Sequence, residues 1–521
     1  MTKRFYITTP IYYVNGAPHI GHAYSSIAAD VMARFKRLDG YDVFFLTGTD
    51  EHGQKIEKAA NDAGISPQHL ADRNSDAFRA MAAAVNLSNT DFIRTTEPRH
   101  QAACAAMWQA LDAAGAIELG HYEGWYATRD EAFYNEDELT TAPDGTKRSP
   151  YGAPVEWVRE PSYFFKLSAF QDRLLALYET NPEFIQPASS RNEVLSFVRS
   201  GLRDISISRT SFTWGVPVPV APGQGAPGET VPGHVMYVWI DALTNYLTAL
   251  GYPDLTAPNM AFWPADIHLV GKEITRFHAI YWPAMLMAAN LPLPKRVFGH
   301  GWWVVDGEKM SKSLGNALEI QPLVTEFGID AIRFFLLREI PFGNDGDVSR
   351  RAIITRLNTE LANGLGNLAQ RTLSFIAKNA GAAIPAAGPA TEADHALTTI
   401  AETLPTRVRA AMDRLAYQEA LEEIWKLIRA ANAYIDHEQP WALRKTNPTR
   451  MAHVLRTLCE TLRIAAILLQ PFMPETMAKL LDQLAIPPTA RTFAALETHL
   501  TEATPLPTPT GLFPRFTEPD A

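Results

Sequence analysis

Two short motifs lie far apart in this chain and carry residue types that handle nucleotide phosphates. The first is His19-Ile20-Gly21-His22, and the second is Lys309-Met310-Ser311-Lys312-Ser313. Histidine rings can hydrogen-bond to phosphate oxygens, lysines add mobile positive charges, and a glycine lets a ligand approach the backbone closely. Together the motifs predict attack on the α-phosphate of a nucleotide, with pyrophosphate as the leaving group.

The residues around the first motif predict a strand, a loop and a helix. The run from Phe5 to Thr9 is apolar and rich in residues that favour strands. From the motif onward, apolar residues recur at three- and four-residue steps until Gly40: Ile20, Ala23, Ile27, Val31, Phe35 and Leu38. The N-terminus of such a helix presents N–H groups and a positive dipole end to an anion. We therefore expect the first motif to face nucleotide phosphates.

Further motifs lie along the chain in a fixed order. They are Tyr12 to Gly16, Thr47-Gly48-Thr49-Asp50-Glu51-His52-Gly53, Tyr237 to Ala242, Gly271-Lys272-Glu273-Ile274, Asn367 to Arg371 and Gln439-Pro440-Trp441. With the two phosphate motifs, they resemble the methionyl-tRNA synthetases, a family of class I aminoacyl-tRNA synthetases, over nearly the whole chain. The resemblance implies a two-step reaction. L-methionine and ATP give methionyl-adenylate and pyrophosphate, and methionyl then passes to the 3′ end of tRNA(Met), including the initiator tRNA.

The resemblance also assigns roles to individual residues. For ATP the matching positions are His19, Gly21, His22, Glu273, Lys309, Ser311 and Lys312, and the two histidines and two lysines would be catalytic. For methionine they are Ile11, Tyr13, Asp50, Trp239, Ala242, Leu243, Tyr246, Ile274, Phe277 and His278. Asp50 would bind the ammonium group, and the aromatic slot would contact the thioether sulfur. Leu243 departs from the proline of well-known members, and Arg209 matches a further site arginine.

Three residues of the C-terminal part are candidates for reading the tRNA. Asn367 and Arg371 are four residues apart and so share one helix face, while Trp441 offers a ring for stacking on a splayed base. The resemblance implies that all three contact the anticodon. The alternative for Trp441 is a hydrophobic plug at the end of a helix, after Pro440.

The chain departs from many relatives at the zinc knuckle of the insertion. Where they carry Cys-x-x-Cys pairs, the stretch after Gly124-Trp125-Tyr126 reads Ala127-Thr128-Arg129-Asp130. Cys104 and Cys459 are the two cysteines, too few for a four-thiolate site. We therefore expect no structural zinc and a knuckle that is absent or held by packing and hydrogen bonds. Mg²⁺ is expected only together with ATP.

The fold expected is α/β: a Rossmann-like parallel-sheet catalytic domain, split by a connective insertion and followed by an all-α helix-bundle anticodon-binding domain. Strand and helix patterns alternate near the N-terminus. A strand is predicted at Asp42 to Leu46, just before Asp50, and a helix is predicted from Gln54. Strands are expected again from Val235 to Ile240 and from Ile267 to Val270.

The domain boundaries follow these changes of pattern. From residue 355 a leucine stripe predicts an antiparallel bundle, and the Pro-rich tail from Thr504 predicts an irregular strap. The expected domains are 1–117 (first half of the catalytic domain), 118–230 (insertion), 231–298 (second half), 299–354 (stem-contact region with the lysine-serine loop) and 355–521 (helical domain).

Composition sets further limits. The 521 residues are 46% hydrophobic and 20% charged, which is typical of a globular protein with two to four domains. A net charge of −10 argues against general affinity for nucleic acid but allows a local basic patch. Without a charged-then-apolar leader or an apolar stretch approaching eighteen residues, we expect a cytoplasmic protein with no membrane partner. Because the chain ends soon after the bundle, we expect a monomer.

Three alternative functions are weaker. Synthetases for leucine, isoleucine or valine carry a far larger editing insertion. A small-molecule nucleotidyltransferase shares the histidine loop, but the long helical region and Trp441 would have no role in it. A tRNA-binding regulator with an inactive site is disfavoured by the intact His19, His22 and Lys312.

Overall fold

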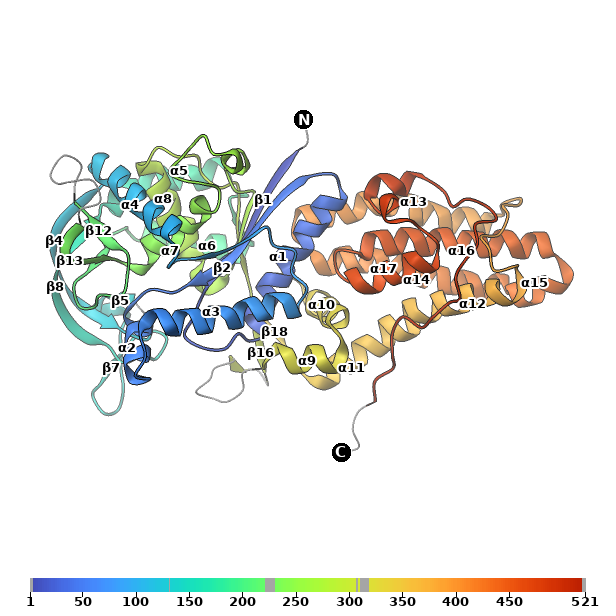
Figure 1. Cartoon of the computed structure of the whole chain (residues 1–521), viewed down its shortest axis with the longest axis horizontal. Helices are drawn as coiled ribbons and strands as arrows, with labels where there is room; N and C mark the ends of the chain where they lie inside the picture. Colours follow the sequence, from blue (N-terminus) through green and yellow to red (C-terminus); the bar gives the residue numbers. More distant parts are fainter. Residues whose placement is uncertain (1–2, 131, 221–229, 306–307, 310–317, 518–521) are drawn as a thin grey trace.

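The computed structural model describes residues 3–130, 132–220, 230–305, 308–309 and 318–517. An α/β body that contains the N-terminus lies at one end of an elongated molecule, and a bundle of long helices lies at the other (Figure 1). Among the described residues, no helix is both long enough and apolar enough to cross a bilayer.

The α/β body is built on a parallel sheet, as the alternating pattern predicts. Its six described strands run in the order β3-β2-β1-β14-β15-β9, and each neighbouring pair is parallel. They are β1 (Arg4–Tyr13), β2 (Asp42–Asp50), β3 (Asp91–Arg94), β9 (Ile185–Gln186), β14 (Ile267–Gly271) and β15 (Val297–His300). Strand β1 therefore lies between β2, its neighbour in the sequence, and β14, which comes some 260 residues later, with Ile7 opposite Ile267.

Both faces of the sheet are covered, as an all-parallel sheet requires. Successive strand residues point to opposite faces, so Ile7 packs into one apolar core and Tyr6 into the other. The first face carries α1 (Ile20–Leu38) and α3 (Pro67–Ala84). The second carries α4 (Pro98–Ala113), α7 (Val238–Thr248) and α8 (Trp282–Ala288). Helix α2 (Gln54–Asp62) begins at the residue predicted for it.

The 118–230 segment forms mostly antiparallel strands. Two long strands, β4 (Ile117–Ala127) and β8 (Glu156–Phe165), pair along their length, with β5 (Ala132–Tyr134) and β10 (Ile205–Ser206) at the sheet's edges. The smaller strands are β6 (Thr140–Thr141), β7 (Lys147–Arg148), β11 (Ser208–Arg209), β12 (Pro217–Pro219) and β13 (Thr230–Met236). Helices α5 (Gln171–Thr180) and α6 (Ala188–Arg199) flank β9, so this segment also supplies an edge strand of the parallel sheet.

One expected strand is wrong. The run from Val235 to Ile240 was expected to resume the parallel sheet, but β13 ends at Met236 and pairs antiparallel with β11 and β12. Residues from Val238 onward belong to α7. The run is rich in β-branched and aromatic residues, yet its apolar side chains continue at helical spacing and bury one face of α7 against α4 and the sheet.

The region that follows the sheet leads into the bundle. Strand β16 (Trp303–Val305) pairs antiparallel with β17 (Glu308–Lys309) and parallel with β18 (Gly346–Asp347). Asp306 and Gly307, between β16 and β17 in the sequence, lie outside the described residues. Helices α9 (Ile320–Phe327) and α10 (Ile329–Arg338) then connect to the bundle.

The bundle confirms the helices predicted from residue 355 onward. Its helices are α11 (Arg350–Arg356), α12 (Asn367–Asn379), α13 (Glu392–Asp413), α14 (Tyr417–Glu438), α15 (Pro440–Thr446), α16 (Pro448–Leu469) and α17 (Pro474–Gln483). A π-helical segment, Leu357–Gly366, joins α11 to α12. This segment and the start of α12 bury the predicted stripe of Leu357, Leu361, Leu365 and Leu368. The tail crosses the bundle as an irregular strap, where Leu506 N–H donates to the Ala382 carbonyl.

Helix α1 connects the two bodies. Its N-terminus carries the first motif, and its middle packs on the bundle, where the Tyr417 hydroxyl donates to the Ala28 carbonyl at 2.7 Å. The buried Asp30 carboxylate lies 2.7 Å from the buried Arg333 guanidinium, which also donates to the Pro471 and Phe472 carbonyls. Such a fully hydrogen-bonded buried pair leaves little freedom for one body to slide on the other.

Candidate active site

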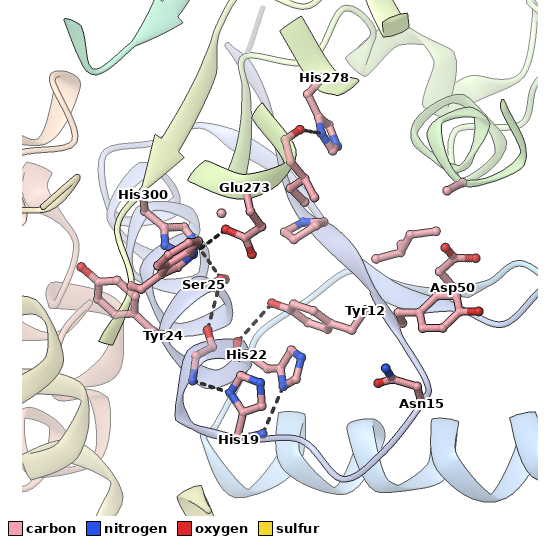
Figure 2. Close-up of a pocket in the computed structure, with 18 of the residues that line it drawn as sticks. Tyr12, Asn15, His19, His22, Tyr24, Ser25, Asp50, Glu273, His278 and His300 are labelled. Atoms are coloured by element: carbon pink, nitrogen blue, oxygen red, sulfur yellow. Dashed lines mark hydrogen bonds between the residues drawn. The ribbon is translucent and has the colours of Figure 1, made fainter. Parts of the chain in front are cut away.

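A cavity of about 540 Å³ opens at the carboxyl ends of β1, β2, β14 and β15, the edge where ligands bind in open parallel sheets. Figure 2 shows His19, His22, Asp50, Glu273 and His278 around this one space. The predicted residues that line it are Ile11, Tyr13, His19, Gly21, His22, Asp50, Trp239, Ala242, Leu243, Tyr246, Glu273, Ile274 and His278. Both predicted groups, for ATP and for methionine, therefore share one cavity.

The two histidines of the first motif also build the start of α1. His19 is the N-cap, and its Nδ1 accepts from the Gly21 N–H at 3.1 Å. His22 Nδ1 accepts from the His19 N–H at 3.1 Å, which completes a capping box. A side-chain carbon at position 21 would lie 2.9 Å from the His19 ring, so any other residue there would displace that ring from its capping position. The sequence did not predict this capping role, which fixes both rings at the positive end of the helix.

On the side predicted to bind ATP, Glu273 is held by residues that sequence reasoning missed. The Trp302 Nε1–H donates to the Glu273 carboxylate at 2.6 Å, and the Trp302 backbone N–H donates to Asp345 at 2.8 Å. Asp345 also pairs with Lys272 at 2.6 Å. His300, which lines the same cavity, lies 2.6 Å from the Ser25 hydroxyl. In the sequence, the one indication that these residues belong to the site is that Trp302 comes shortly before the lysine-serine motif.

On the side predicted to bind methionine, the slot is aromatic and neutral. Trp239 lines the cavity and stacks on Phe277, with ring centroids 3.6 Å apart, so Phe277 supports the slot from behind. Burial lowers the pKa of His278 to about 4. The neutral ring donates from Nδ1 to the Ile274 carbonyl at 3.0 Å, so Nε2 accepts from the Tyr246 hydroxyl at 2.6 Å. Asp50, the buried last residue of β2, lies at the cavity wall.

Some expected site residues lie elsewhere. Arg209 is 1% exposed, and its guanidinium lies 4.4 Å from the centroid of the Tyr237 ring rather than at the cavity wall. Lys309 pairs through its backbone with Val304 in β16. Ser311 and Lys312 lie outside the described residues, as does the side chain of Lys309.

The three candidate anticodon residues belong to α12 and α15, which Figure 1 shows in the part of the bundle away from the sheet. The Arg371 guanidinium in α12 lies 5.5 Å from the Trp441 ring centroid in α15 and pairs with Asp436 at 2.6 Å. The Trp441 side chain is 44% exposed whereas Pro440 is buried, so Trp441 is not a core plug. Asn367, at the start of α12, is exposed as well.

The residues at the zinc-knuckle position do not fit a zinc ion. Ala127 offers no ligand and is buried against Ala153 and Val155. The Asp130 carboxylate accepts hydrogen bonds from the Tyr134 and Ser149 hydroxyls. Packing and hydrogen bonds hold this part of the insertion, which is one of the two outcomes expected from the sequence.

Two family models match the chain. One, described as class I tRNA synthetases (M), matches residues 5–373. The other, described as the anticodon binding domain of methionyl tRNA ligase, matches residues 384–521. The first match covers the α/β body and extends into α12, and the second covers the helices from α13 onward and the tail.

Curated relatives and solved structures match over the whole length. The methionine–tRNA ligase of Brucella suis biovar 1 (strain 1330) is 55% identical over 519 residues, covering 99% of both chains. That of Rhizobium meliloti (strain 1021) is 54% identical over 523 residues, covering 100% of this chain and 99% of the relative. A structure of Mycobacterium tuberculosis methionyl-tRNA synthetase in complex with methionyl-adenylate matches with a TM-score of 0.95 at 52% identity, covering 99% of this chain and 100% of that one. The chain therefore belongs to the methionine–tRNA ligases, a family of class I aminoacyl-tRNA synthetases.

Proposed function

We propose that this protein activates L-methionine with ATP and transfers the methionyl group to tRNA(Met), including the initiator tRNA. The observation that carries the proposal is the single cavity that joins a capped helix N-terminus to a neutral aromatic slot with a carboxylate at its wall. A solved relative with 52% identity is described with methionyl-adenylate, the intermediate of this reaction.

In the first step, a carboxylate oxygen of methionine attacks the α-phosphorus of ATP and the bond to the β-phosphate oxygen breaks. No side-chain nucleophile is needed, so catalysis consists of alignment and charge stabilisation. Asp50 binds the ammonium group, and the slot around Trp239 and Tyr246 holds the thioether. The residues that bind ATP are His19, Gly21, His22, Glu273, Lys309, Ser311 and Lys312.

In the second step, a hydroxyl of the terminal ribose of the tRNA attacks the carbonyl carbon of the adenylate, and AMP leaves with the electron pair of the broken anhydride bond. Asn367, Arg371 and Trp441 read the anticodon at the far end of the bundle. The rigid packing between α1 and the bundle supports this division of labour, because it holds the cavity at a fixed distance from the anticodon surface.

Other parts of the proposal concern partners and organisation. Mg²⁺ would arrive on the ATP phosphates rather than in a protein cage. The chain would act as a monomer in the cytoplasm. We keep the division into 1–117, 118–230, 231–298, 299–354 and 355–521, with the second segment also lending β9 to the catalytic sheet.

The first prediction concerns the amino acid. A screen of all twenty amino acids for ATP–pyrophosphate exchange is expected to give methionine the highest kcat/KM, with norleucine and homocysteine weaker. Because the slot selects by shape and sulfur contacts, leucine and valine should be lower by about tenfold or more. If leucine or valine outperforms methionine, the proposed substrate is wrong.

The second prediction concerns metal. Because Ala127 gives no ligand and Asp130 is engaged by Ser149 and Tyr134, purified protein is expected to carry no stoichiometric zinc. Elemental analysis provides the measurement. A strong chelator should leave exchange activity intact once Mg²⁺ is restored. One zinc per chain, or activity that returns only with zinc, would contradict the prediction.

A further inference from the structure

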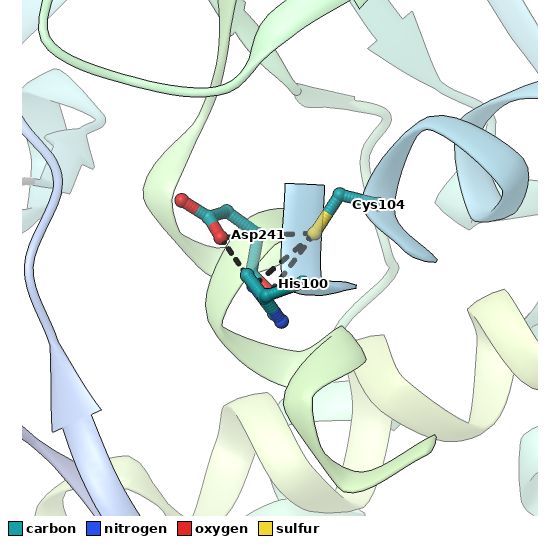
Figure 3. A group of neighbouring side chains, drawn as sticks. All are labelled: His100, Cys104 and Asp241. Atoms are coloured by element: carbon teal, nitrogen blue, oxygen red, sulfur yellow. Dashed lines mark hydrogen bonds and ion pairs between the residues drawn. The ribbon is translucent and has the colours of Figure 1, made fainter. Parts of the chain in front are cut away.

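A buried carboxylate, Asp241, lies behind the methionine slot. It belongs to α7, is 0% exposed and is not among the residues that line the cavity. Figure 3 shows it beside His100 and Cys104 of α4. Asp241 Oδ1 lies 2.7 Å from His100 Nε2, and Oδ2 lies 2.6 Å from His52 Nδ1. Both carboxylate oxygens are therefore hydrogen-bonded to imidazoles in the protein interior.

These contacts join the two halves of the methionine site. Helix α7 carries Trp239, Ala242, Leu243 and Tyr246, which form the wall of the slot. His52 follows Asp50, the proposed ligand of the ammonium group, by two residues. A bond between His52 and Asp241 therefore sets the distance between the end of β2 and α7.

Glu51, which lies between Asp50 and His52, is fixed as well. The buried Glu51 carboxylate accepts from Arg94 Nε at 2.7 Å, and the Trp214 Nε1–H donates to the Glu51 carbonyl at 2.6 Å. With Glu51 anchored to β3, the bond from His52 is the link that directs this loop toward α7. Pairing with Tyr13 in β1 holds the backbone of Asp50, and the anchors of the two residues that follow it hold the loop on its other side.

The electrostatics agree with this arrangement. Burial alone would raise the pKa of Asp241, but its interactions with His52 and His100 hold that pKa well below the usual range. Asp241 is therefore ionised, and each imidazole directs an N–H toward it. The charge and both hydrogen bonds link α7 to α4 and to the loop after β2, so changing Asp241 or either histidine leaves the remaining partners buried and poorly matched.

The same group has the composition of a metal site, but its geometry favours a hydrogen-bond network. Cys104 Sγ lies 3.2 Å from His100 Nε2 and 3.7 Å from Asp241 Oδ1. Burial raises the pKa of the Cys104 thiol well above its ordinary value, which keeps the thiol protonated. The His100–Asp241 contact of 2.7 Å is a hydrogen-bond distance, so the two ligands already bind each other.

We infer that Asp241 and His52 form a positioning pair that holds the ammonium-binding carboxylate of Asp50 in register with the aromatic slot, and so determine affinity for methionine. The inference rests on the proposed function, in which methionine is the amino acid. Neither residue of the pair is among those that line the cavity. The expected signature is a change in methionine binding without a matching change in ATP binding.

The test uses a rescue pair at position 52. In His52→Leu the donor is lost at similar volume, and the KM for methionine in pyrophosphate exchange is expected to rise about tenfold, as for the loss of one hydrogen bond to a charged group. His52→Asn keeps an N–H near the place of Nδ1 and should recover most of this affinity. The KM for ATP should stay within about twofold in both variants, because the nucleotide side shares no contact with the pair.

Asp241→Asn provides the second variant, and Cys104→Ser is the matched control from the same buried cluster. Asp241→Asn should raise the methionine KM, whereas Cys104→Ser should leave it unchanged. Methionine-dependent protection against thermal unfolding gives an independent measure of binding if turnover is too low. A merely structural role would reduce the amount of active enzyme and leave the methionine KM of the folded fraction as in the parent.

The outcomes separate the inference from the proposed function. If the parent protein shows no methionine-dependent exchange, the proposed function fails. If the parent uses methionine but His52→Leu and Asp241→Asn keep the parent's KM for methionine, the positioning pair is refuted. It is also refuted if Cys104→Ser impairs methionine binding as strongly as they do, since that result indicates a metal site or a general packing effect.

Discussion

Replacing Lys312 with alanine is expected to lower the turnover of adenylate formation on the order of 10²–10³-fold, as when one preorganised charge-stabilising donor is removed from an active site. Negative charge builds on the β-phosphate as the bond to the α-phosphate breaks. A lysine that meets this growing charge stabilises the transition state more than bound ATP. ATP binding should therefore weaken far less than turnover.

The described residues on either side of the segment that carries Lys312 lie close to the cavity and to the first motif. On one side Lys309 pairs with Val304 in β16, just beyond the cavity residue Trp302. On the other side the Leu318 carbonyl accepts from the Ile20 N–H in the first motif at 3.0 Å. The segment that carries Lys312 thus starts and ends beside the residues proposed to hold ATP.

The measurement is single-turnover adenylate formation together with equilibrium binding of ATP to Lys312→Ala. Lys58→Ala, at an exposed position in α2, controls for the loss of a positive charge. Exchange kinetics equal to those of the parent would remove Lys312 from the mechanism. A loss confined to ATP binding would make it a ground-state ligand instead.

Trp441→Ala is expected to depress charging of tRNA(Met) by the loss of base stacking, on the order of 1–3 kcal/mol, while tRNA-independent pyrophosphate exchange stays near that of the parent. The ring is exposed at the remote end of the bundle and lies beside the Arg371 guanidinium. It is not among the residues that line the cavity. The two reactions should therefore separate.

Three comparisons make this test specific. Trp441→Phe keeps a stacking ring and should retain most charging, and Trp157→Ala removes another exposed tryptophan, in β8, as a control. Moving the CAU anticodon into an unrelated tRNA should improve its charging by the parent but little by Trp441→Ala. If Trp441→Ala lowers charging and exchange equally, the anticodon assignment fails.

The elements with strong periodicity were predictable from the sequence. The helix that follows the first motif and the leucine stripe of the bundle have apolar residues at regular steps, and both fold as expected. Strand β9 is only Ile185–Gln186, too short to show a period, and it becomes a strand because β15 offers it a partner. The strand predicted from Val235 to Ile240 is wrong for a different reason, because the tertiary packing of α7 overrides the strand propensity of these residues.

Residues of the site were predictable where they belong to a local motif. His19, His22 and Asp50 stand next to strand and helix ends, and the structure places them at one cavity. The partners that hold them come from distant segments and show no local spacing. His52 reaches Asp241 across 189 positions of sequence, a contact that only the folded sheet creates.

The pairing of β1 with β14 has a consequence for the order in which the protein is made. Residues 4 to 50 can form β1, α1 and β2 early in translation, but the other neighbour of β1 begins at Ile267. Closing so long a loop is slow, and more than half of the chain must leave the ribosome before the sheet is complete. Until then the inner edge of β1 is an unpaired, apolar strand edge, a template for wrong pairing with other chains. The nascent chain therefore has a defined period of greatest risk of aggregation, which ends when β14 is inserted.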